Sequence, residues 1–538
     1  MSESGSAAAP EQTSRLRELP VYWWLAPIFL LFGFIRLRLI DFPLERDEGE
    51  YAYSGQLLLK GMFSYHSLHT MKLPGMAVVN ALAMLLFGPS ARGIHLGLMA
   101  ANFATTLLLF QLAKRLFNPS IAVMAAATFA MLSLALTVNG FAAHATQFLL
   151  LPMTAGLLLL LKSFDQGRRS LLFAGGFCLG FAFLIKQPGI FFVMFAWLVL
   201  VRQSLAAQRG LRALASSSTI LLGGAATPFL LTCLALAAGG DFRSFWFWTV
   251  EYAGAYRSGV SAKVALQSFG SGLWNVALAN PLLWLAALGG IFTLAFGHGS
   301  KEKRDFLFAF LVVSFLAICP ALYFRPHYFV LMLPVIAILA AVGASAHPME
   351  KLAGRHAPAV VFCLCFSVSL LQQHVYFFVA APTALSRWVY PQSPFVEAPL
   401  IADFLRSRSE PQDRIAVLGS EPELLFYANR SSATGFIYMY PLTEVQPFAA
   451  RMQEEMVAEI TAAKPRFIVL VNTNGPSWGF VPGSSHAVID WATRYVNEQY
   501  KEIAMVDIGP DRTRYHWDNA EAFQPEFPAA VFVYERIR

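Results

Sequence analysis

The segment YWWLAPIFLLFGFIRLRLIDFPLERDEGEY, residues 22–51, joins an apolar stretch to a crowded acidic one. About 20 apolar residues cross the hydrocarbon core of a bilayer, so residues 21–40 predict a membrane helix. Five acidic residues follow it directly: Asp41, Glu45, Asp47, Glu48 and Glu50. Like charges this close destabilise one another unless a cation, a ligand or a change of protonation compensates. The cluster indicates either acid/base chemistry at the membrane surface or the solvated start of a loop.

The composition is that of an integral membrane protein. Of the 538 residues, 56% are hydrophobic and 14% charged, and the mean hydropathy is +0.52. Residues 1–390 hold 27 Lys and Arg against 14 Asp and Glu, whereas residues 391–538 hold 13 against 19. A basic membrane body therefore precedes an acidic soluble tail. These figures exclude a disordered chain, a disulfide-stapled secreted domain and a soluble nucleic-acid binder, so we expect no nucleic-acid partner.

Apolar stretches predict about eleven membrane spans. They lie near 21–40, 92–113, 119–138, 146–162, 170–186, 188–202, 216–238, 273–296, 305–323, 328–346 and 357–380. Lys and Arg are concentrated in alternate connections, including Lys351 and Arg355, and the positive-inside rule places these connections in the cytoplasm. We therefore expect a cytoplasmic N-terminus and an extracytoplasmic (periplasmic) tail, in a multi-pass protein of the cell inner membrane.

Three regions follow from this topology. Residues 1–20 are expected to form a cytoplasmic leader, residues 21–380 a polytopic helical domain with an outer loop at 41–91, and residues 381–538 an extracytoplasmic α/β domain. In the tail, RIAVLG (414–419), FIVLV (467–471), EIAMVDI (502–508) and AVFVYERI (530–537) predict strands. Helices are expected near 397–408, 445–463 and 486–500. The tail has no Gly-rich phosphate loop and no metal-ligand spacing.

Further motifs stand at the expected outer edges of the membrane. HTMKLPGMAVVNALAMLLFG (69–88) carries Lys72 and Pro74 before a short apolar helix, which we expect to lie partly in the interface. FLIKQPGIFF (183–192) places Lys186 in a hairpin between two spans, and YFRPHYFVLMLPVIAILAA (323–341) begins with Arg325. A cation at this depth either reaches toward the interface or faces a polar cavity.

This order of motifs resembles the GT-C superfamily of polyprenyl-phosphate-sugar glycosyltransferases, in particular bacterial relatives of protein O-mannosyltransferases and of the lipid A aminoarabinose transferase. The resemblance covers roughly residues 20–346. It implies that Asp47 contacts the acceptor nucleophile as general base and that Lys72 binds the donor phosphate. Glu48 is a second candidate catalytic residue, which, like Glu50, could position Asp47 or the sugar hydroxyls. The implied reaction is an inverting transfer from a polyprenyl monophosphate to a glycan, lipid or protein acceptor at the outer face of the membrane.

Physical chemistry is consistent with these roles. A sugar on a lipid phosphate leaves a phosphate anion, so the enzyme needs a carboxylate to take the acceptor proton and fixed cations for the developing charge. Lys186 and Arg325 are candidate further phosphate ligands. Four more residues are candidate substrate contacts, each with a structural alternative as an ion-pair, loop or belt residue: Arg46, Glu50, His69 and Tyr328.

The relatives often have a second carboxylate at the outer start of the fourth span, where this chain has His144 and Gln147. We therefore expect no obligatory metal, although a divalent ion stays open. Two other functions compete. A transporter or flippase of lipid-linked sugars would place its charges near the bilayer midplane, and a non-catalytic glycan-binding assembly protein would need neither Asp47 nor Lys72.

Overall fold

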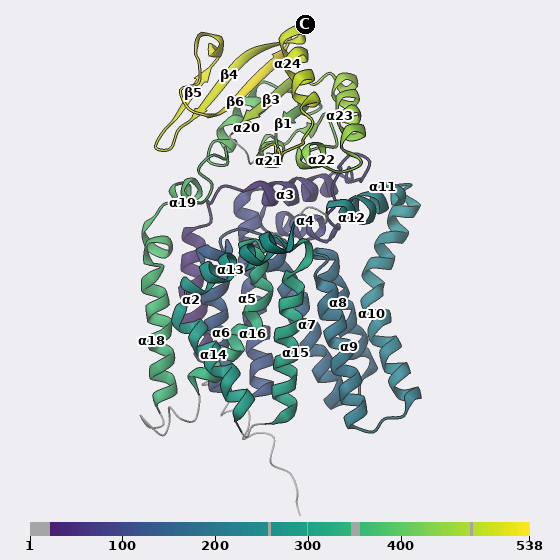
Figure 1. The fold of residues 1–538 in the computed structure, drawn as a ribbon, viewed down its shortest axis with the longest axis vertical. Helices are drawn as coiled ribbons and strands as arrows, with labels where there is room; N and C mark the ends of the chain where they lie inside the picture. Colours follow the sequence, from purple (N-terminus) through teal and green to yellow (C-terminus); the bar gives the residue numbers. More distant parts are fainter. Residues whose placement is uncertain (1–21, 257–259, 298–299, 346–355, 474–476, 538) are drawn as a thin grey trace, which may run out of the picture.

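The computed structural model describes residues 22–256, 260–297, 300–345, 356–473 and 477–537. The expected leader at 1–20 lies outside these ranges, as do Lys351 and Arg355. A bundle of long helices forms one end of the molecule and a smaller α/β domain the other, with a layer of short helices between them (Figure 1). The expected fold, a helical membrane body with a small C-terminal sheet domain, is confirmed.

The bundle is built from twelve of the described helices. They are α2 (Leu25–Arg38), α5 (Ala91–Leu116), α6 (Pro119–Leu134), α7 (Ala145–Gln166), α8 (Arg169–Ile185), α9 (Gly189–Ala206), α10 (Leu211–Ala238), α13 (Ala262–Leu278), α14 (Pro281–Phe296), α15 (Lys301–Ile318), α16 (Leu333–Ala344) and α18 (Ala357–Gln372). A 3-10 segment, η5 (Pro326–Met332), leads into α16.

Five helices in the described ranges are long and apolar enough to cross a membrane, or six if α13 and α14 make one span. They are α5, α7, α9, α10 and the combined segment Pro326–Ala344. Large apolar side chains face outward from the bundle: Leu30 is 75% exposed and Phe296 is 78% exposed. This outward apolar surface is typical of helices that contact lipid. The number of eleven spans stays a prediction.

The single helix predicted near 273–296 is interrupted in the structure. The structure has two helices there, α13 and α14, bent by 107°. The break falls at Asn280, whose backbone is not helical and which precedes Pro281. Proline lacks an N–H group and disfavours the helical conformation of the residue before it. The buried Asn280 side chain accepts a hydrogen bond from Gln373 Nε2 at 3.0 Å, which ties the break to α18.

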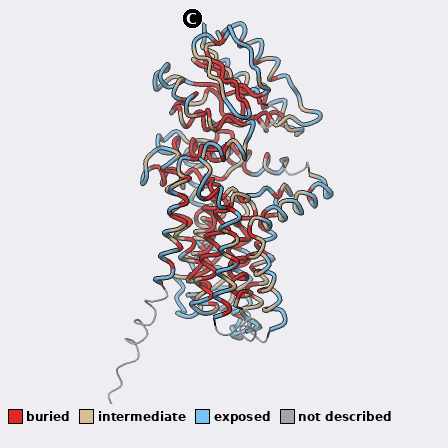
Figure 2. The backbone as a smooth tube through the Cα atoms, turned by 90° about the vertical axis from the view of Figure 1, so that its left-hand side faces the viewer, coloured by how far each residue is buried: buried red, intermediate tan, exposed pale blue. Residues whose placement is uncertain are grey.

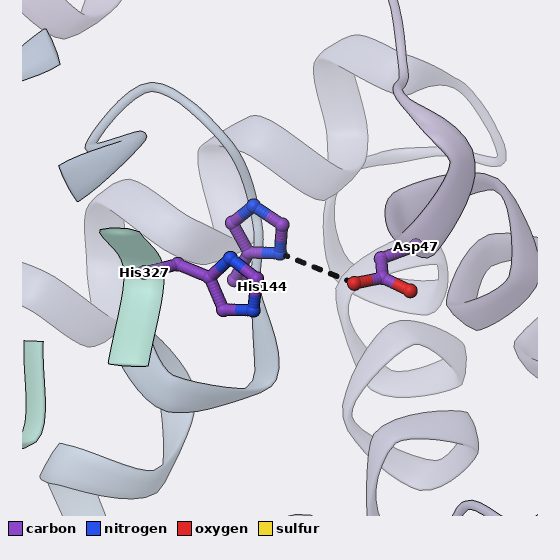
Figure 3. Close-up of side chains that lie close together, drawn as sticks. All are labelled: Asp47, His144 and His327. Carbon is purple, nitrogen blue, oxygen red and sulfur yellow. Dashed lines mark ion pairs between the residues drawn. The ribbon is translucent and has the colours of Figure 1, made fainter. Parts of the chain in front are cut away.

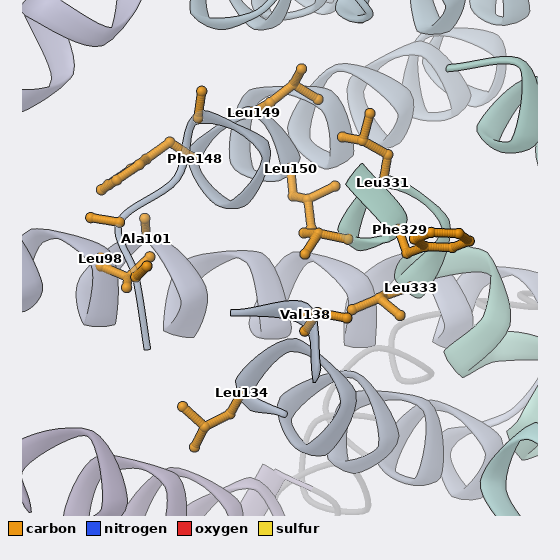
Figure 4. Packing of buried hydrophobic residues seen from close by; sticks show 14 of the residues in the cluster. Leu98, Ala101, Leu134, Val138, Phe148, Leu149, Leu150, Phe329, Leu331 and Leu333 are labelled. Carbon is orange, nitrogen blue, oxygen red and sulfur yellow. The ribbon is translucent and has the colours of Figure 1, made fainter. Parts of the chain in front are cut away.

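Apolar side chains from helices far apart in sequence fill the centre of the bundle. Leu98 on α5, Leu150 on α7, Val138 after α6 and Leu333 on α16 are nearly inaccessible to solvent (Figure 4). Burial runs through the middle of the bundle and continues into the sheet domain, while exposed residues lie on the outside (Figure 2). The two ends of the molecule are therefore packed against each other through the intervening layer.

The layer between bundle and domain contains α3 (Arg46–Leu59), α4 (Gly75–Phe87), α11 (Phe242–Trp246), the π-helix η2 (Phe247–Tyr252) and α12 (Ala253–Tyr256). A capping box starts α3: the Glu45 carboxylate accepts from Glu48 N, and Glu48 Oε2 accepts from Glu45 N. Pro74 precedes α4, and Gly88 (φ 95°) ends it. The short helix predicted after Lys72 is thus confirmed.

The C-terminal domain is a mixed six-stranded sheet in the order β2-β1-β3-β6-β4-β5. Strands β1 (Arg414–Leu418), β2 (Ser431–Ser432) and β3 (Phe467–Asn472) are parallel, whereas β4 (Tyr500–Ile508), β5 (Thr513–Trp517) and β6 (Ala529–Arg536) pair antiparallel. Its helices are α20 (Ala398–Ser407), α21 (Pro422–Ala428), α22 (Tyr440–Thr443), α23 (Ala449–Ala463) and α24 (Ala487–Gln499), and π-helix η6 (Val375–Val379) and α19 (Pro382–Val389) connect the domain to α18. All four predicted strands and all three predicted helices form.

Helix α21 docks the domain on α3. A Cβ atom at Gly49 would lie 2.5 Å from the backbone nitrogen of Glu423, so the two backbones approach as closely as only glycine permits. Tyr427 Oη accepts a hydrogen bond from Leu44 N at 3.0 Å, and Tyr53 Oη accepts one from Ser432 N at 2.8 Å. The helix that carries Asp47 is therefore fixed by contacts with the C-terminal domain.

Candidate active site

A cavity of about 520 Å³ lies where the bundle, the helical layer and the C-terminal domain meet. Its wall includes most of the residues singled out from the sequence. Asp47, Glu50, His69, Lys72, Lys186, Arg325 and Tyr328 all line it. The loops between α3 and α4, between α8 and α9, and before η5 converge here, although they are separated by more than a hundred residues along the chain.

Asp47 and Lys72 are in direct contact at the cavity wall. Lys72 Nζ lies 2.7 Å from Asp47 Oδ1 and 2.5 Å from Glu50 Oε2. The same ammonium group stands over the ring of Tyr51, 4.3 Å from its centroid. Glu50 is held in turn by the Thr70 hydroxyl, which donates to Glu50 Oε1 at 2.5 Å. One lysine therefore neutralises part of the charge of two carboxylates.

This contact sets the protonation of both groups. Burial favours the neutral form of Asp47, but the positive charge of Lys72 outweighs it and holds the pKa of Asp47 well below its usual range. For Lys72, burial opposes the charge, and the two carboxylates nevertheless raise its pKa well above the usual value. Both groups are charged near neutral pH, as a base and a phosphate ligand require.

Two histidines face the other side of Asp47. His144 Nδ1 lies 3.9 Å from Asp47 Oδ2, and the rings of His144 and His327 stack with centroids 4.1 Å apart (Figure 3). Burial lowers the pKa of His144 to about 4, which keeps the ring neutral. The ligand atoms of Asp47, His144 and His327 lie within 4.8 Å of one another, so the three side chains could hold a metal ion. The sequence favoured neither histidine as a functional residue.

Two further cations border the cavity. Lys186 follows α8, and its Nζ stands 4.6 Å from the centroid of the Tyr328 ring. Burial lowers the pKa of Lys186 to about 8, and repulsion by Lys72 and Arg325 adds to this effect, against an opposing pull from Asp47. Arg325 precedes η5 and stands over the ring of Tyr323. With Lys72, these residues bring three cations to a wall that also holds the carboxylates of Asp47 and Glu50.

The structure places two of the predicted residues elsewhere. Glu48 does not line the cavity: its buried carboxylate accepts from Ala143 N at 2.6 Å, lies 3.0 Å from His95 Nε2, and closes the capping box of α3. Arg46 turns toward the C-terminal domain, where Nη2 pairs with Glu421 Oε1 at 2.8 Å. Both positions hold α3 in place, because each side chain joins the helix to a neighbouring segment.

The C-terminal domain contributes residues that the sequence did not reveal. Tyr438, Tyr440 and Pro441 line the cavity, and Tyr438 Oη donates a hydrogen bond to Asp47 Oδ1 at 3.0 Å. The Tyr438 ring also lies 5.2 Å from Lys72 Nζ. The aromatic run FIYMYP at 436–441 in an otherwise acidic tail is the one local signal of this role.

Comparisons with known proteins agree with this architecture. A family model described as dolichyl-phosphate-mannose-protein mannosyltransferase matches residues 71–234. A comparison with curated proteins finds no match. Among solved structures, ArnT from Cupriavidus metallidurans bound to undecaprenyl phosphate is similar, with a TM-score of 0.61 and 16% identity over 96% of this chain and 98% of that one.

The archaeal oligosaccharyltransferase AglB from Archaeoglobus fulgidus is similar too. In complex with an inhibitory peptide and a dolichol-phosphate, it gives a TM-score of 0.53 at 11% identity, over 94% of this chain and 75% of that one. In complex with Zn and sulfate, it gives 0.53 at 14% identity, over 93% and 74%. Identities this low establish the fold, and the expected resemblance to GT-C glycosyltransferases is confirmed at that level.

Proposed function

We propose that this protein is an inverting glycosyltransferase. In this reaction a sugar moves from a polyprenyl monophosphate to a glycan, lipid or protein acceptor at the extracytoplasmic face of the membrane. The observation that carries the proposal is the contact between Asp47 and Lys72, at 2.7 Å, inside a cavity that also holds Lys186 and Arg325. Two carboxylates, Asp47 and Glu50, and three cations suit a reaction in which a proton is removed and a phosphate is released.

In this proposal the donor phosphate binds Lys72, Lys186 and Arg325. The relatives that share the fold were solved with undecaprenyl phosphate or dolichol-phosphate, which supports a lipid phosphate as the ligand of this cavity. A phosphate that reaches Lys72 competes with Asp47 and Glu50 for its ammonium group. Binding of the donor therefore weakens the ion pair at Asp47 and raises the basicity of that carboxylate at the moment the acceptor needs it.

The transfer then takes place as a single displacement. Asp47 takes the proton of the acceptor hydroxyl or amine, whose oxygen or nitrogen attacks the anomeric carbon from the side opposite the phosphate. The bond between the anomeric carbon and the phosphate oxygen breaks, and the lipid phosphate leaves with its charge against the three cations. The configuration of the anomeric carbon inverts, and no covalent intermediate on the protein is required.

We expect this step to need no metal ion. Lys72 already supplies a positive charge at Asp47, and a metal held by Asp47, His144 and His327 would compete with it. If those residues do hold an ion, it would supply Lewis-acid chemistry or an activated acceptor there. Transfer by protein treated with EDTA, with and without added Mn²⁺ or Zn²⁺, measures the requirement.

Replacement of the base tests the function. Purified wild-type protein is expected to carry a polyprenyl phosphate or its glycoside, detectable by native mass spectrometry, and to transfer the sugar to an acceptor. Asp47→Asn is expected to lower transfer at least about 100-fold, as loss of a general base does. Asp41→Asn is the matched control, because Asp41 is half exposed and pairs with Arg92 away from the cavity.

Two outcomes would contradict the proposal. Transfer by Asp47→Asn at the wild-type rate would show that Asp47 is not the base of the reaction. Movement of lipid-linked sugar across the membrane of proteoliposomes, without any glycosylated product, would identify a transporter instead.

A further inference from the structure

A second cluster of ligand-type side chains lies at the junction between the loop after α3 and the C-terminal domain. It consists of His69, Glu455 and Glu459, and one ligand atom from each lies within 4.8 Å of the others. Glu455 and Glu459 are four residues apart on α23, so they share a face of that helix. None of the three takes part in the reaction proposed above.

The Glu459 carboxylate is oriented by its neighbours. Its Oε2 accepts hydrogen bonds from Thr434 Oγ1 at 2.5 Å and from Gly435 N at 3.0 Å. Its Oε1 points toward His69 and lies 3.8 Å from Nε2, which is too far for a hydrogen bond. Carboxylates that bind metal ions are commonly held by outer hydrogen bonds in this way, with one oxygen left for the ion.

The imidazole of His69 is buried and fixed. The side chain is 4% exposed, the ring stacks on Trp248 with centroids 5.0 Å apart, and Phe436 packs against its edge. Its Nδ1 has no hydrogen-bond partner among the described residues. A Cβ atom at Gly435 would lie 2.7 Å from the ring, so glycine is needed there to bring the two segments together. The ring is thus held rigidly beside Glu459.

The charges of the cluster are uncompensated in the described part of the chain. Two carboxylates four residues apart on a helix repel each other, and no Lys or Arg that the structure describes forms an ion pair with either one.

We propose that His69, Glu455 and Glu459 bind a divalent transition-metal ion of the Zn²⁺ or Mn²⁺ class. One imidazole and two carboxylates suit these ions, whereas Ca²⁺ and Mg²⁺ prefer oxygen ligands alone. The ion links the loop that carries Lys72 to the domain that carries Tyr438. A hydrogen bond from His69 N to Gly435 O, at 2.9 Å, already joins these two segments. Its role is structural, and the site does not depend on the proposed glycosyl transfer.

Zinc binding to the full-length protein in detergent tests the site. Protein stripped with EDTA is titrated with Zn²⁺ by calorimetry, and bound metal is counted by mass spectrometry. We expect binding that raises Tm, and at least a tenfold loss of affinity in the double variant E455Q/E459Q. Its Tm without metal should match that of the wild type. Glu454→Gln is the matched control, because Glu454 is exposed one position away on α23 and should bind as the wild type does.

The other histidine cluster provides the discriminating variant. The double variant H144A/H327A removes two ligands of the cluster at Asp47 and should keep the affinity that E455Q/E459Q loses. Zinc binding that is abolished by H144A/H327A and unaffected by E455Q/E459Q would overturn the proposal. Absence of zinc binding at micromolar concentrations would overturn it as well.

Discussion

Tyr438 Oη donates a hydrogen bond to Asp47 Oδ1 at 3.0 Å, although 391 positions separate the two residues in the sequence. Tyr438 belongs to the C-terminal domain, whereas Asp47 stands in the first turn of α3. Asp47 Oδ1 thus receives two donors, Tyr438 and Lys72, which together orient the carboxylate. The C-terminal domain is therefore part of the wall that orients the proposed base.

Removal of this hydroxyl should slow the transfer without preventing donor binding. A hydrogen bond to a charged group contributes roughly 1.5–3 kcal/mol, so Tyr438→Phe is expected to lower kcat about tenfold or more, with little change in the KM for the donor. Because the lost bond favoured the carboxylate form, the acidic limb of the pH profile should move to higher pH. Steady-state kinetics across pH measures both effects, and Tyr534→Phe, in strand β6, is the control. An unchanged kcat would exclude a positioning role for Tyr438.

Lys72 should matter most for the donor. Lys72→Ala removes the cation closest to Asp47 and leaves two carboxylates, the partly buried Asp47 and the buried Glu50, close to each other. We expect the KM for the lipid-phosphate donor to rise at least about tenfold and Tm to fall, since a buried charge without its partner is costly. Lys72→Arg keeps the charge and should recover part of the stability. Donor binding by Lys72→Ala equal to that of the wild type would contradict the assignment.

Activity should decline in mildly alkaline solution because of Lys186. Burial lowers the pKa of this lysine to about 8, so its charge is present below that pH and is lost as the pH rises through it. The attraction to the donor phosphate weakens accordingly, and kcat/KM, which reports the free enzyme, should fall above about pH 8. Lys186→Arg stays charged over this range, so its profile should lack the decline. A decline of the same size in Lys186→Arg would assign the titration to another group.

Glu423 is expected to limit stability. Neither of its carboxylate oxygens has a hydrogen-bond partner among the described residues, and burial, with the charge of Glu421, raises its pKa well above 4.5. A raised pKa in the folded protein stabilises the fold at low pH, and that contribution is lost as the pH rises toward the folded value. Glu423→Gln should therefore raise Tm near pH 8 by an amount that corresponds to about 1–3 kcal/mol, and much less near pH 4.5. The exposed Glu410→Gln should leave Tm unchanged at both values, and a Tm gain for Glu423→Gln that is independent of pH would contradict the explanation.

The bundle and the sheet could be predicted because their signals are local. Strands β1, β3, β4 and β6 appear in the sequence as short runs of β-branched and aromatic residues, and they form where expected. Strand β2 has only two residues, and in β5, TRYHW, Arg and His separate the β-branched and aromatic residues, so neither strand was predicted. The bend between α13 and α14 was missed because its apolar residues continue across Asn280 and hydropathy alone does not register a change of direction.

The residues of the candidate site could likewise be predicted where their signals in the sequence are local. Asp47 and Lys72 stood out because charge is rare beside an apolar segment, and Lys186 and Arg325 because each interrupts one. Glu48 looked equivalent to Asp47 in the sequence, but successive residues of a helix point in different directions. As a result, Asp47 reaches the cavity and Glu48 reaches His95 and the backbone of Ala143.

The sequence by itself determined the membrane body, the acidic tail, most of the sheet and the charged residues worth following, since each depends on residue type and local spacing. The tertiary structure decided which of those charges share one cavity, how the soluble domain reaches it through Tyr438, and where His69 meets α23. These contacts join segments that are tens to hundreds of residues apart, and only the packing of side chains and backbones specifies which distant groups come within hydrogen-bond distance.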